Sequence, residues 1–284
     1  MVDIQISLIG NDDEILLDHG GDYILTTGTI GFGIPPTEVR IEPSASDGGV
    51  FRFSRRDVRE LDLPIVIFGH DRDNVEFNLR RLAAILRETP FKVRATYDTG
   101  EQWELEAIYI GGGETQYGSD AGKEYCRWVI QAQCPQPFWV SSTSVSYTVG
   151  SGDAGRSLIP WLAEMRVSSS QAIGAINVEN PGDVDSYPVW TLNGPFDQAT
   201  ITNTDGTQVF VYNAIVAAGA KIIVDTRDGT VKNGSNTNMY QYLGTSPKLF
   251  SIPAGTSQVT VAATNTTSAT SISLSFQPRK EIVH

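Results

Sequence analysis

The sequence has few of the residues that most often build catalytic or metal centres. It holds two cysteines and three histidines (His19, His70 and His284) among 284 residues. Two cysteines cannot form a disulfide scaffold or a four-cysteine zinc site. Three histidines leave little for metal binding or for histidine-based catalysis. We therefore expect no enzymatic activity, no cofactor and no bound metal.

Basic residues and long apolar runs are scarce as well. Lys and Arg number 21 against 33 Asp and Glu, which gives a net charge of −12 and a pI near 4.7. A nucleic-acid binder needs a basic face that neutralises phosphates, so we expect no stable nucleic-acid binding. The most apolar stretch, residues 214–224, is interrupted by Gly219 and Lys221. It is shorter than the roughly 20 residues of a membrane-spanning helix, and the N-terminus shows no secretory signal, so we expect no membrane insertion.

What the sequence does contain suits two domains of different surface character. The hydrophobic content is 40%, and 284 residues exceed one typical core. Residues 1–140 hold 23 acidic and 13 basic residues, whereas Ser, Thr, Asn and Gly dominate from residue 141 onward. We predict one domain over 1–140 and a second over 176–284. Residues 141–175, with an apolar patch at 158–162, are predicted to be a linker or a local elaboration.

One segment, residues 73–88, has the pattern of an amphipathic helix. Asp73 can cap its N-terminus, and Glu76 completes a capping-box-like pair. Thr89 precedes Pro90, and the residue before a proline avoids the α conformation, so the helix ends there. The apolar stripe that we expect to pack on a sheet comprises Val75, Leu79, Leu82, Ala83 and Leu86, widened by Phe77 and Ile85.

Almost all the remaining sequence has the pattern of strands and turns. Hairpin turns are indicated at residues 98–100, 203–206 and 228–229, where Asn or Asp and Gly separate β-rich runs. Alternation of apolar residues with Ser and Thr over 259–276 is typical of half-buried strands. The fold class is therefore mainly β with one main helix, and short strands at this density indicate a sandwich or a barrel.

The two cysteines fall on one predicted strand. Cys126 and Cys134 are eight residues apart, or about 27 Å at roughly 3.4 Å per residue. A disulfide needs Cα atoms within about 7 Å, so the two cannot pair with each other. We expect both to act as small apolar core residues.

No catalytic pattern emerges from the other polar residues. His70 precedes residues 71–73, where an aspartate serves better as a helix cap than as a metal ligand. The glycines at 111–113 are not followed by Lys-Ser/Thr or by a helix, so they do not indicate a phosphate loop. Asp225 and Asp228 flank a hairpin, and turn chemistry explains both.

The cluster Arg55, Arg56 and Arg59 is the one basic exception in the acidic first half. A solvated loop is one interpretation. Ion pairing with the many carboxylates of a neighbouring subunit is the other, and it makes these arginines candidate inter-subunit contacts.

An ordered set of short motifs in the second half carries a family resemblance. The motifs are INVENPG (176–182), YPVWTLNG (187–194), ATITN (199–203), AGAKIIVDT (218–226), LFSIPAG (249–255) and the run 271–276. In this order they resemble the C-terminal domain of siphophage distal tail proteins, which are baseplate hub components of phages with long non-contractile tails. In the first half, FRFSRR (51–56), the strand 61–68, the helix and CPQPFW (134–139) resemble the ring-forming domain of the same family.

The resemblance implies a fold, a place and a set of partners. The fold is a split-barrel-like ring-forming domain followed by a galectin-like β-sandwich. The place is the virion, at the tip of a phage tail, after synthesis in the host cytoplasm. The partners are five further copies in a hexameric ring, the tail tube protein, a tail-tip hub protein and, as a further candidate, a receptor-binding protein.

A carbohydrate-binding module that attaches to surface glycans is the alternative function. Tyr240, Tyr242 and Trp190 could stack on sugars, although their β-rich surroundings favour packing in a core or on a sheet. Residues 180–283 contain no histidine, which a galactose site of the galectin type would use. A glycan hydrolase ranks third, because no carboxylate pair stands out from the turn and surface acids.

Overall fold

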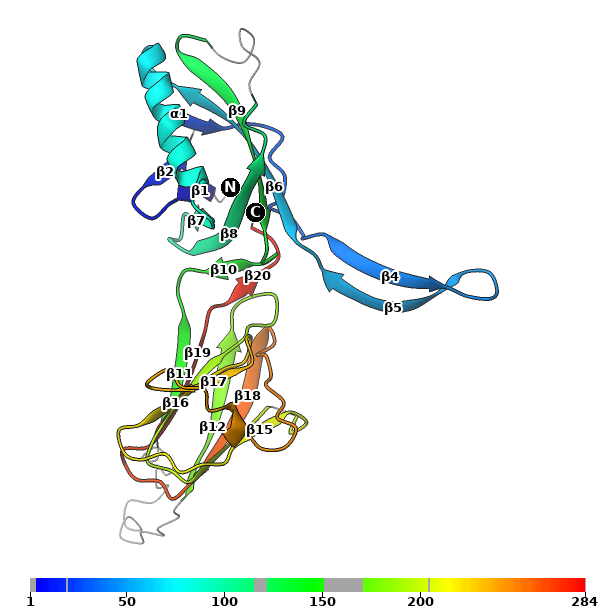
Figure 1. The fold of residues 1–284 in the computed structure, drawn as a ribbon, viewed down its shortest axis with the longest axis vertical. Helices are drawn as coiled ribbons and strands as arrows, with labels where there is room; N and C mark the ends of the chain where they lie inside the picture. The colour runs from blue at the N-terminus through cyan, green and yellow to red at the C-terminus, as the bar shows by residue number, and fades with distance from the viewer. Residues whose placement is uncertain (1–3, 19, 115–121, 151–170, 204, 284) are drawn as a thin grey trace. The chain divides into compact units, whose positions relative to one another are not determined.

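The chain forms two compact units in the computed structural model, which describes residues 4–18, 20–114, 122–150, 171–203 and 205–283 (Figure 1). Unit 1 comprises Met1–Ser142 together with Lys280–His284, and unit 2 comprises Thr143–Arg279. Within the described residues, no helix is long and apolar enough to cross a membrane.

The limits of the units differ from the predicted domains at both ends of unit 2. Strands β11 (Val145–Gly150) and β12 (Gln171–Asn180) begin inside the predicted linker, and β11 pairs along its whole length with β19 (Ser271–Phe276). At the other end, Val283 is buried in the core of unit 1, so the last residues return there. The predicted apolar patch at 158–162 lies outside the described residues.

Unit 1 is built on one antiparallel sheet with the strand order β2-β1-β7-β8-β9-β6-β3. Its ends approach each other, because the amide of Asp18 after β2 donates to the carbonyl of Tyr23 in β3 at 3.0 Å, so the sheet is nearly closed like a barrel. The strands are β1 (Ile4–Ile9), β2 (Glu14–Leu17), β3 (Tyr23–Leu25), β6 (Arg59–Phe68), β7 (Phe91–Tyr97), β8 (Gln102–Gly111) and β9 (Tyr125–Cys134), with β10 (Trp139–Ser141) and β20 (Arg279–Lys280) off this path.

The helix α1 (Arg72–Leu86) is the one predicted, with corrected ends. Asp71, not Asp73, is the N-cap, because its Oδ1 accepts the amide of Asn74 at 2.8 Å. The predicted apolar face is wrong at Phe77, which is 64% exposed. Asn78 is buried instead. The side-chain NH2 of Asn78 donates a hydrogen bond to the backbone carbonyl of Phe68. The backbone carbonyl of Asn78 accepts one from the hydroxyl of Tyr23, so this buried residue has polar partners.

Burial in unit 1 follows the expected alternation along the strands. In β6, the side chains at 61, 63, 65 and 67 are buried and those between them are more exposed. Cys126 and Cys134 are both buried on the inner side of β9, and no disulfide joins them. Burial raises the pKa of the Cys134 thiol to about 12, which keeps it protonated and unreactive.

Unit 2 is a two-sheet sandwich. One sheet has the order β11-β19-β13-β16-β17 and the other the order β12-β18-β14-β15. The strands not yet given are β13 (Val189–Asn193), β14 (Gln198–Thr202), β15 (Val209–Tyr212), β16 (Lys221–Asp225), β17 (Thr230–Asn233) and β18 (Gly255–Thr264). The described residues also include the short 3-10 helix η2 (Tyr240–Tyr242). The predicted turn at 98–100 joins β7 to β8, and the one at 228–229 joins β16 to β17.

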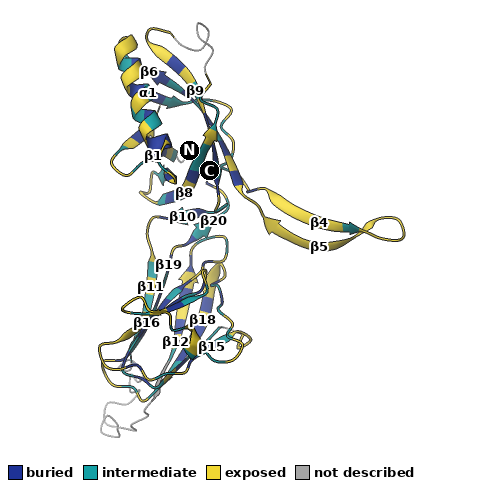
Figure 2. Ribbon diagram, viewed as in Figure 1, coloured by how far each residue is buried: buried dark blue, intermediate teal, exposed yellow. Residues whose placement is uncertain are grey.

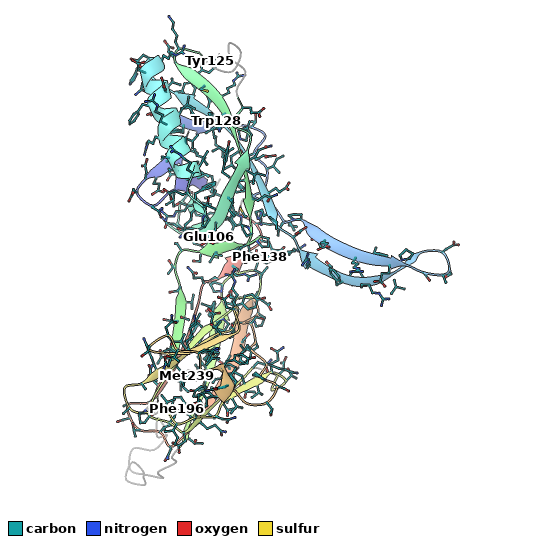
Figure 3. All side chains as sticks on the ribbon, in the orientation of Figure 1. Glu106, Tyr125, Trp128, Phe138, Phe196 and Met239 are labelled. Carbon is teal, nitrogen blue, oxygen red and sulfur yellow. The ribbon has the colours of Figure 1, made fainter. Side chains whose placement is uncertain are left out.

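Aromatic rings fill the space between the two sheets. Trp190 packs edge-on against Phe210 and Phe250, with ring centroids 6.1 and 6.3 Å apart. Phe196 belongs to the same core, and the partly buried Met239 packs against this core (Figure 3). The mainly β architecture with one helix is therefore confirmed, and the galectin-like character of the sandwich stays a prediction.

Candidate functional site

The residues considered for catalysis have structural roles. Asp225 accepts the amides of Arg227 and Asp228 through its Oδ1, so it stabilises the turn after β16. Gly113 allows a close approach, because a Cβ there would lie 2.4 Å from the Trp128 ring. Among the described residues, no group of three or more His, Cys, Asp or Glu side chains could hold a metal ion.

The aromatic residues considered for sugar stacking are not gathered on one surface. Trp190 is fully buried at the centre of the sandwich, so it cannot face a ligand. Tyr242 is half-buried against Tyr212, with ring centroids 6.1 Å apart. Tyr240 is 47% exposed.

Among the residues that the structure describes, the most exposed regular structure is a hairpin in unit 1. Strands β4 (Thr37–Pro43) and β5 (Gly49–Arg56) pair only with each other and extend from the sheet (Figure 1). Figure 2 shows both strands in the exposed colour along almost their whole length. Two strands of seven and eight residues are thus held in register without a core of their own.

The two faces of this hairpin differ in chemistry. Ile41 pairs directly with Phe51, and Val39 lies two residues before Ile41, so these three side chains share one face. They are 61%, 61% and 52% exposed, respectively. We call Val39, Ile41 and Phe51 the apolar face of the hairpin.

The opposite face carries ion pairs. Arg52 contacts Glu42 and Arg55 contacts Glu38, each with an N–O distance of 2.6 Å. All four side chains are more than 40% exposed, so each pair stabilises the hairpin weakly. Phe53 pairs with Arg40 and Val50 pairs with Glu42, so both apolar side chains lie on the side of the ion pairs. The hairpin consequently has one apolar side and one side where charged and apolar residues are mixed.

The base of the hairpin is fixed to unit 1. The amide of Asp57 donates to the carbonyl of Pro36 at 2.8 Å across the two strands. Arg56 pairs with Glu281 at 2.6 Å and donates to the hydroxyl of Thr37. These contacts hold the first residues of the ribbon while the rest projects.

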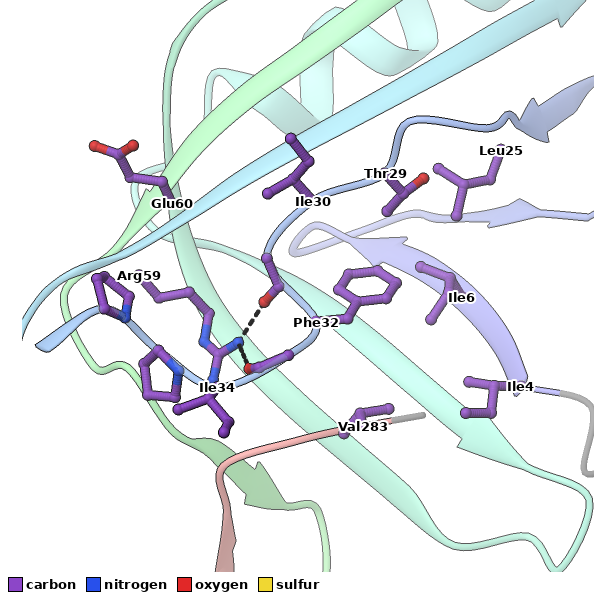
Figure 4. Close-up of a pocket in the computed structure, with 14 residues that line it drawn as sticks. Ile4, Ile6, Leu25, Thr29, Ile30, Phe32, Ile34, Arg59, Glu60 and Val283 are labelled. Carbon is purple, nitrogen blue, oxygen red and sulfur yellow. Dashed lines mark hydrogen bonds between the residues drawn. The ribbon is translucent and has the colours of Figure 1, made fainter.

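Arg59 is placed differently from the contact role predicted for it. Its side chain is 1% exposed and lies inside unit 1. The guanidinium donates to the carbonyls of Pro137 and Glu281, each at 2.6 Å. It also donates to the carbonyl of Gly33 at 2.7 Å and to that of Gly31 (Figure 4). Burial lowers the pKa of this guanidinium. Four carbonyl partners satisfy it within its own chain, so we withdraw Arg59 as a candidate inter-subunit contact.

Beside Arg59 lies an apolar groove of about 1050 Å³ (Figure 4). Its lining comes from β1, Leu25 of β3, the segment 29–36, the start of β6 and Val283. Ile30 and Ile34 are each 61% exposed at this groove. Gly31 has a φ of +106°, and a Cβ there would lie 2.3 Å from the carbonyl oxygen of Glu60, so glycine is required for this segment to pass close to β6.

Arg55 and Arg56 were predictable as candidate contacts from the sequence, whereas the hairpin and the groove were not predicted. The hairpin had a signal, because SASDGG (44–49) is a turn sequence between two β-rich runs. The groove had none, since its lining residues are spread from Ile4 to Val283.

The comparisons with known proteins agree with the resemblance found in the sequence. Residues 181–279 match the family described as "Siphovirus-type tail component, C-terminal domain". No match was found among curated proteins.

Two solved structures share the fold over nearly the whole chain. The crystal structure of the SPP1 Dit protein, described as a paradigm of the hub adsorption apparatus in phages that infect Gram-positive bacteria, matches with a TM-score of 0.67 at 12% identity, over 97% of this chain and 98% of that one. A chain of the phage P2 baseplate in its activated conformation with calcium matches with a TM-score of 0.50 at 9% identity, over 99% of both chains. The predicted resemblance to siphophage distal tail proteins is therefore confirmed.

Proposed function

We propose that this chain is a structural component of a phage tail tip, namely a ring adaptor that joins the tail tube to the baseplate and its receptor-binding apparatus. The observation that carries the proposal is the match of residues 181–279 to the C-terminal domain of siphovirus-type tail components, in a chain whose fold follows SPP1 Dit from end to end. A ring adaptor of this type would have a structural role and no enzymatic activity.

Unit 1 is the part that we assign to ring assembly. Its hairpin exposes an apolar face, and large exposed apolar surfaces mark sites of protein–protein contact. Arg55 and Arg56 lie on β5, and the exposed pair of Arg55 with Glu38 can exchange its internal carboxylate for one on a neighbouring copy. We propose six copies in the ring, with Arg55 and Arg56 near the contact between copies.

The partners of the ring would be the tail tube protein on one side and a tail-tip hub protein on the other. Residues 1–140 carry 23 acidic against 13 basic residues, so a channel lined by this unit would repel DNA rather than hold it. A conduit for an ejected genome benefits from that repulsion. Unit 2 has few charges and would serve attachment of neighbouring tail proteins.

Immunogold labelling tests the assignment to the tail tip. Antibodies raised against residues 143–279 should label virions of the encoding phage at the distal end of the tail. The same antibodies preincubated with the purified chain should label nothing, which controls for specificity. Label on the capsid, or virions without label, would contradict the proposed function.

A further inference from the structure

Unit 1 presents two apolar surfaces that the described residues of its own chain leave uncovered. One is the apolar face of the hairpin, whose three residues belong to neither hydrophobic core. The other is the groove bordered by Ile30 and Ile34. An isolated two-stranded hairpin is at best marginally stable in water, so a hairpin of this length is expected to rest on another surface.

The groove cannot receive the hairpin of its own chain. Pro36 lines the groove and directly precedes β4, whereas Ile41 lies five residues further along the ribbon. At roughly 3.4 Å per residue, the centre of the apolar face is about 17 Å from that rim. The strands pair from Thr37 and Arg56 to Pro43 and Gly49 with one register shift between Arg40 and Ile41, so folding the hairpin back onto its own unit would break this ladder.

The charges favour another copy of the same chain as the occupant. Residues 37–56 hold four arginines and three acidic residues. The remainder of residues 1–140 holds nine basic and 20 acidic residues. A hairpin of slightly positive charge therefore meets attraction at the acidic surface of a neighbouring unit 1, and apolar contact follows at short range.

The groove also has the capacity for this occupant. Pockets of about 300–1,000 Å³ enclose most of a drug-sized ligand. The volume of about 1050 Å³ therefore has room for the ring of Phe51 and the aliphatic side chains of Val39 and Ile41.

We propose that the apolar face of the hairpin in one copy binds in the groove of unit 1 in the next copy. Donor and acceptor are different surfaces, so the contact is heterologous, and a heterologous contact repeated with a closing rotation generates a ring. This inference rests on the proposed ring and names the contact that builds it.

Three matched substitutions of exposed isoleucines test the contact. Ile41→Asp places a charge on the hairpin face, Ile34→Asp places one at the groove, and Ile215→Asp does the same in unit 2, where Ile215 is 80% exposed. All three should fold like the wild type by circular dichroism. By native mass spectrometry, Ile41→Asp and Ile34→Asp should be monomers of about 31 kDa, and Ile215→Asp should keep the wild-type ring.

Mixing the two defective variants gives the decisive result. Ile41→Asp retains an intact groove and Ile34→Asp retains an intact hairpin, so one contact can form between them. The mixture should yield heterodimers with two subunits and no larger species. Rings formed by Ile41→Asp alone, or a mixture that remains monomeric, would overturn the proposed contact.

Chemical crosslinking detects the contact directly in assembled copies, whereas the substitutions above detect it by the loss of the ring. Cys126 and Cys134 are buried, so introduced cysteines are the reactive ones. A short bis-maleimide should convert Ile34→Cys/Ile41→Cys into a ladder of covalent oligomers and leave Ile41→Cys/Ile215→Cys uncrosslinked. Equal ladders in both would overturn the contact.

Failure of the contact and failure of the proposed function give different results. If Ile41→Asp still forms rings, the contact is wrong and the tail-ring function is unaffected. If the wild-type chain stays monomeric up to its solubility limit, the proposed contact is overturned together with the self-assembling ring, while the immunogold experiment still decides the location.

Discussion

Unit 1 and unit 2 differ in how much of their apolar side-chain surface they bury within one molecule. In unit 2, the rings of Trp190, Phe210 and Phe250 contact one another between two sheets, and the strands alternate buried and partly exposed residues. Unit 1 also has a core of buried hydrophobic residues, but it carries in addition a hairpin and a groove whose apolar surfaces stay exposed. The proposed contact between copies would account for this difference, because it would cover the apolar surfaces that unit 1 leaves exposed.

Separating the units should produce the largest effect. A fragment of residues 143–279 contains both sheets of the sandwich and its core, and it lacks the hairpin and groove. We expect a folded, soluble monomer with complete loss of self-association. Analytical ultracentrifugation beside the full chain measures this. A fragment that still forms closed rings would show that unit 2, not unit 1, carries assembly.

Two aromatic truncations compare the units within one chain. Trp190→Ala removes a fully buried ring and should lower the free energy of unfolding of unit 2 by about 3–5 kcal/mol. Phe51→Ala removes a ring that is 61% exposed and should change the stability of the monomer by less than about 0.5 kcal/mol. Urea denaturation followed by circular dichroism at low protein concentration measures both. A large loss for Phe51→Ala would mean that the hairpin packs within its own molecule.

Arg59 and Arg55, four residues apart in the sequence, should likewise differ in how much they contribute to the stability of unit 1. Arg59→Ala leaves four buried carbonyls without their donor and should destabilise unit 1 by about 2–4 kcal/mol. Arg59→Lys keeps the charge but not the planar fork, so it should fall between Ala and wild type. Arg55→Ala removes an exposed ion pair and should cost less than about 1 kcal/mol. Thermal denaturation compares the three, and equal losses for Arg55 and Arg59 would contradict their different burial.

The smallest expected effect is a pH dependence at Glu104. Burial alone would raise the pKa of this carboxyl, but hydrogen bonds from Lys92 and Arg94 outweigh it and hold the pKa below its usual range. Because the folded-state pKa is depressed, the stabilisation is present above the unfolded-state pKa and is lost as the pH falls through the folded-state value.

A substitution on β8 tests this pH dependence. Lys92 is 46% exposed and Arg94 is 23% exposed, so solvent screens their attraction for Glu104 and the contribution is about 1 kcal/mol or less. Glu104→Gln should lower stability near neutral pH and flatten the acid side of the stability profile, whereas Glu38→Gln on the hairpin should not. An unchanged acid limb in Glu104→Gln would contradict the assignment.

Several elements were predictable because short-range patterns specify them. The alternation along β9 placed Cys126 and Cys134 on one buried face, and the structure agrees. The turns at 98–100 and 228–229 followed from their Asp and Gly residues. The helix was predicted within two residues at each end. Its N-cap was wrong because Asp71, not Asp73, accepts the amide of Asn74, and its buried face was wrong because Asn78 donates a hydrogen bond to Phe68 inside the unit. Apolar periodicity does not represent such hydrogen bonds.

The sequence by itself determined the class of the fold, the division into a strongly acidic half and a half with fewer charges, and the resemblance to a tail component. These depend on composition, on period-two patterns and on motifs within a few residues of one another. The tertiary structure alone decided that Arg59 is internal while Arg55 is exposed, and that segments near both ends of the chain form a groove beside the hairpin. Those outcomes depend on which distant segments meet, because burial and hydrogen bonding of a side chain are set by neighbours far away in sequence, such as Pro137 and Glu281 around Arg59.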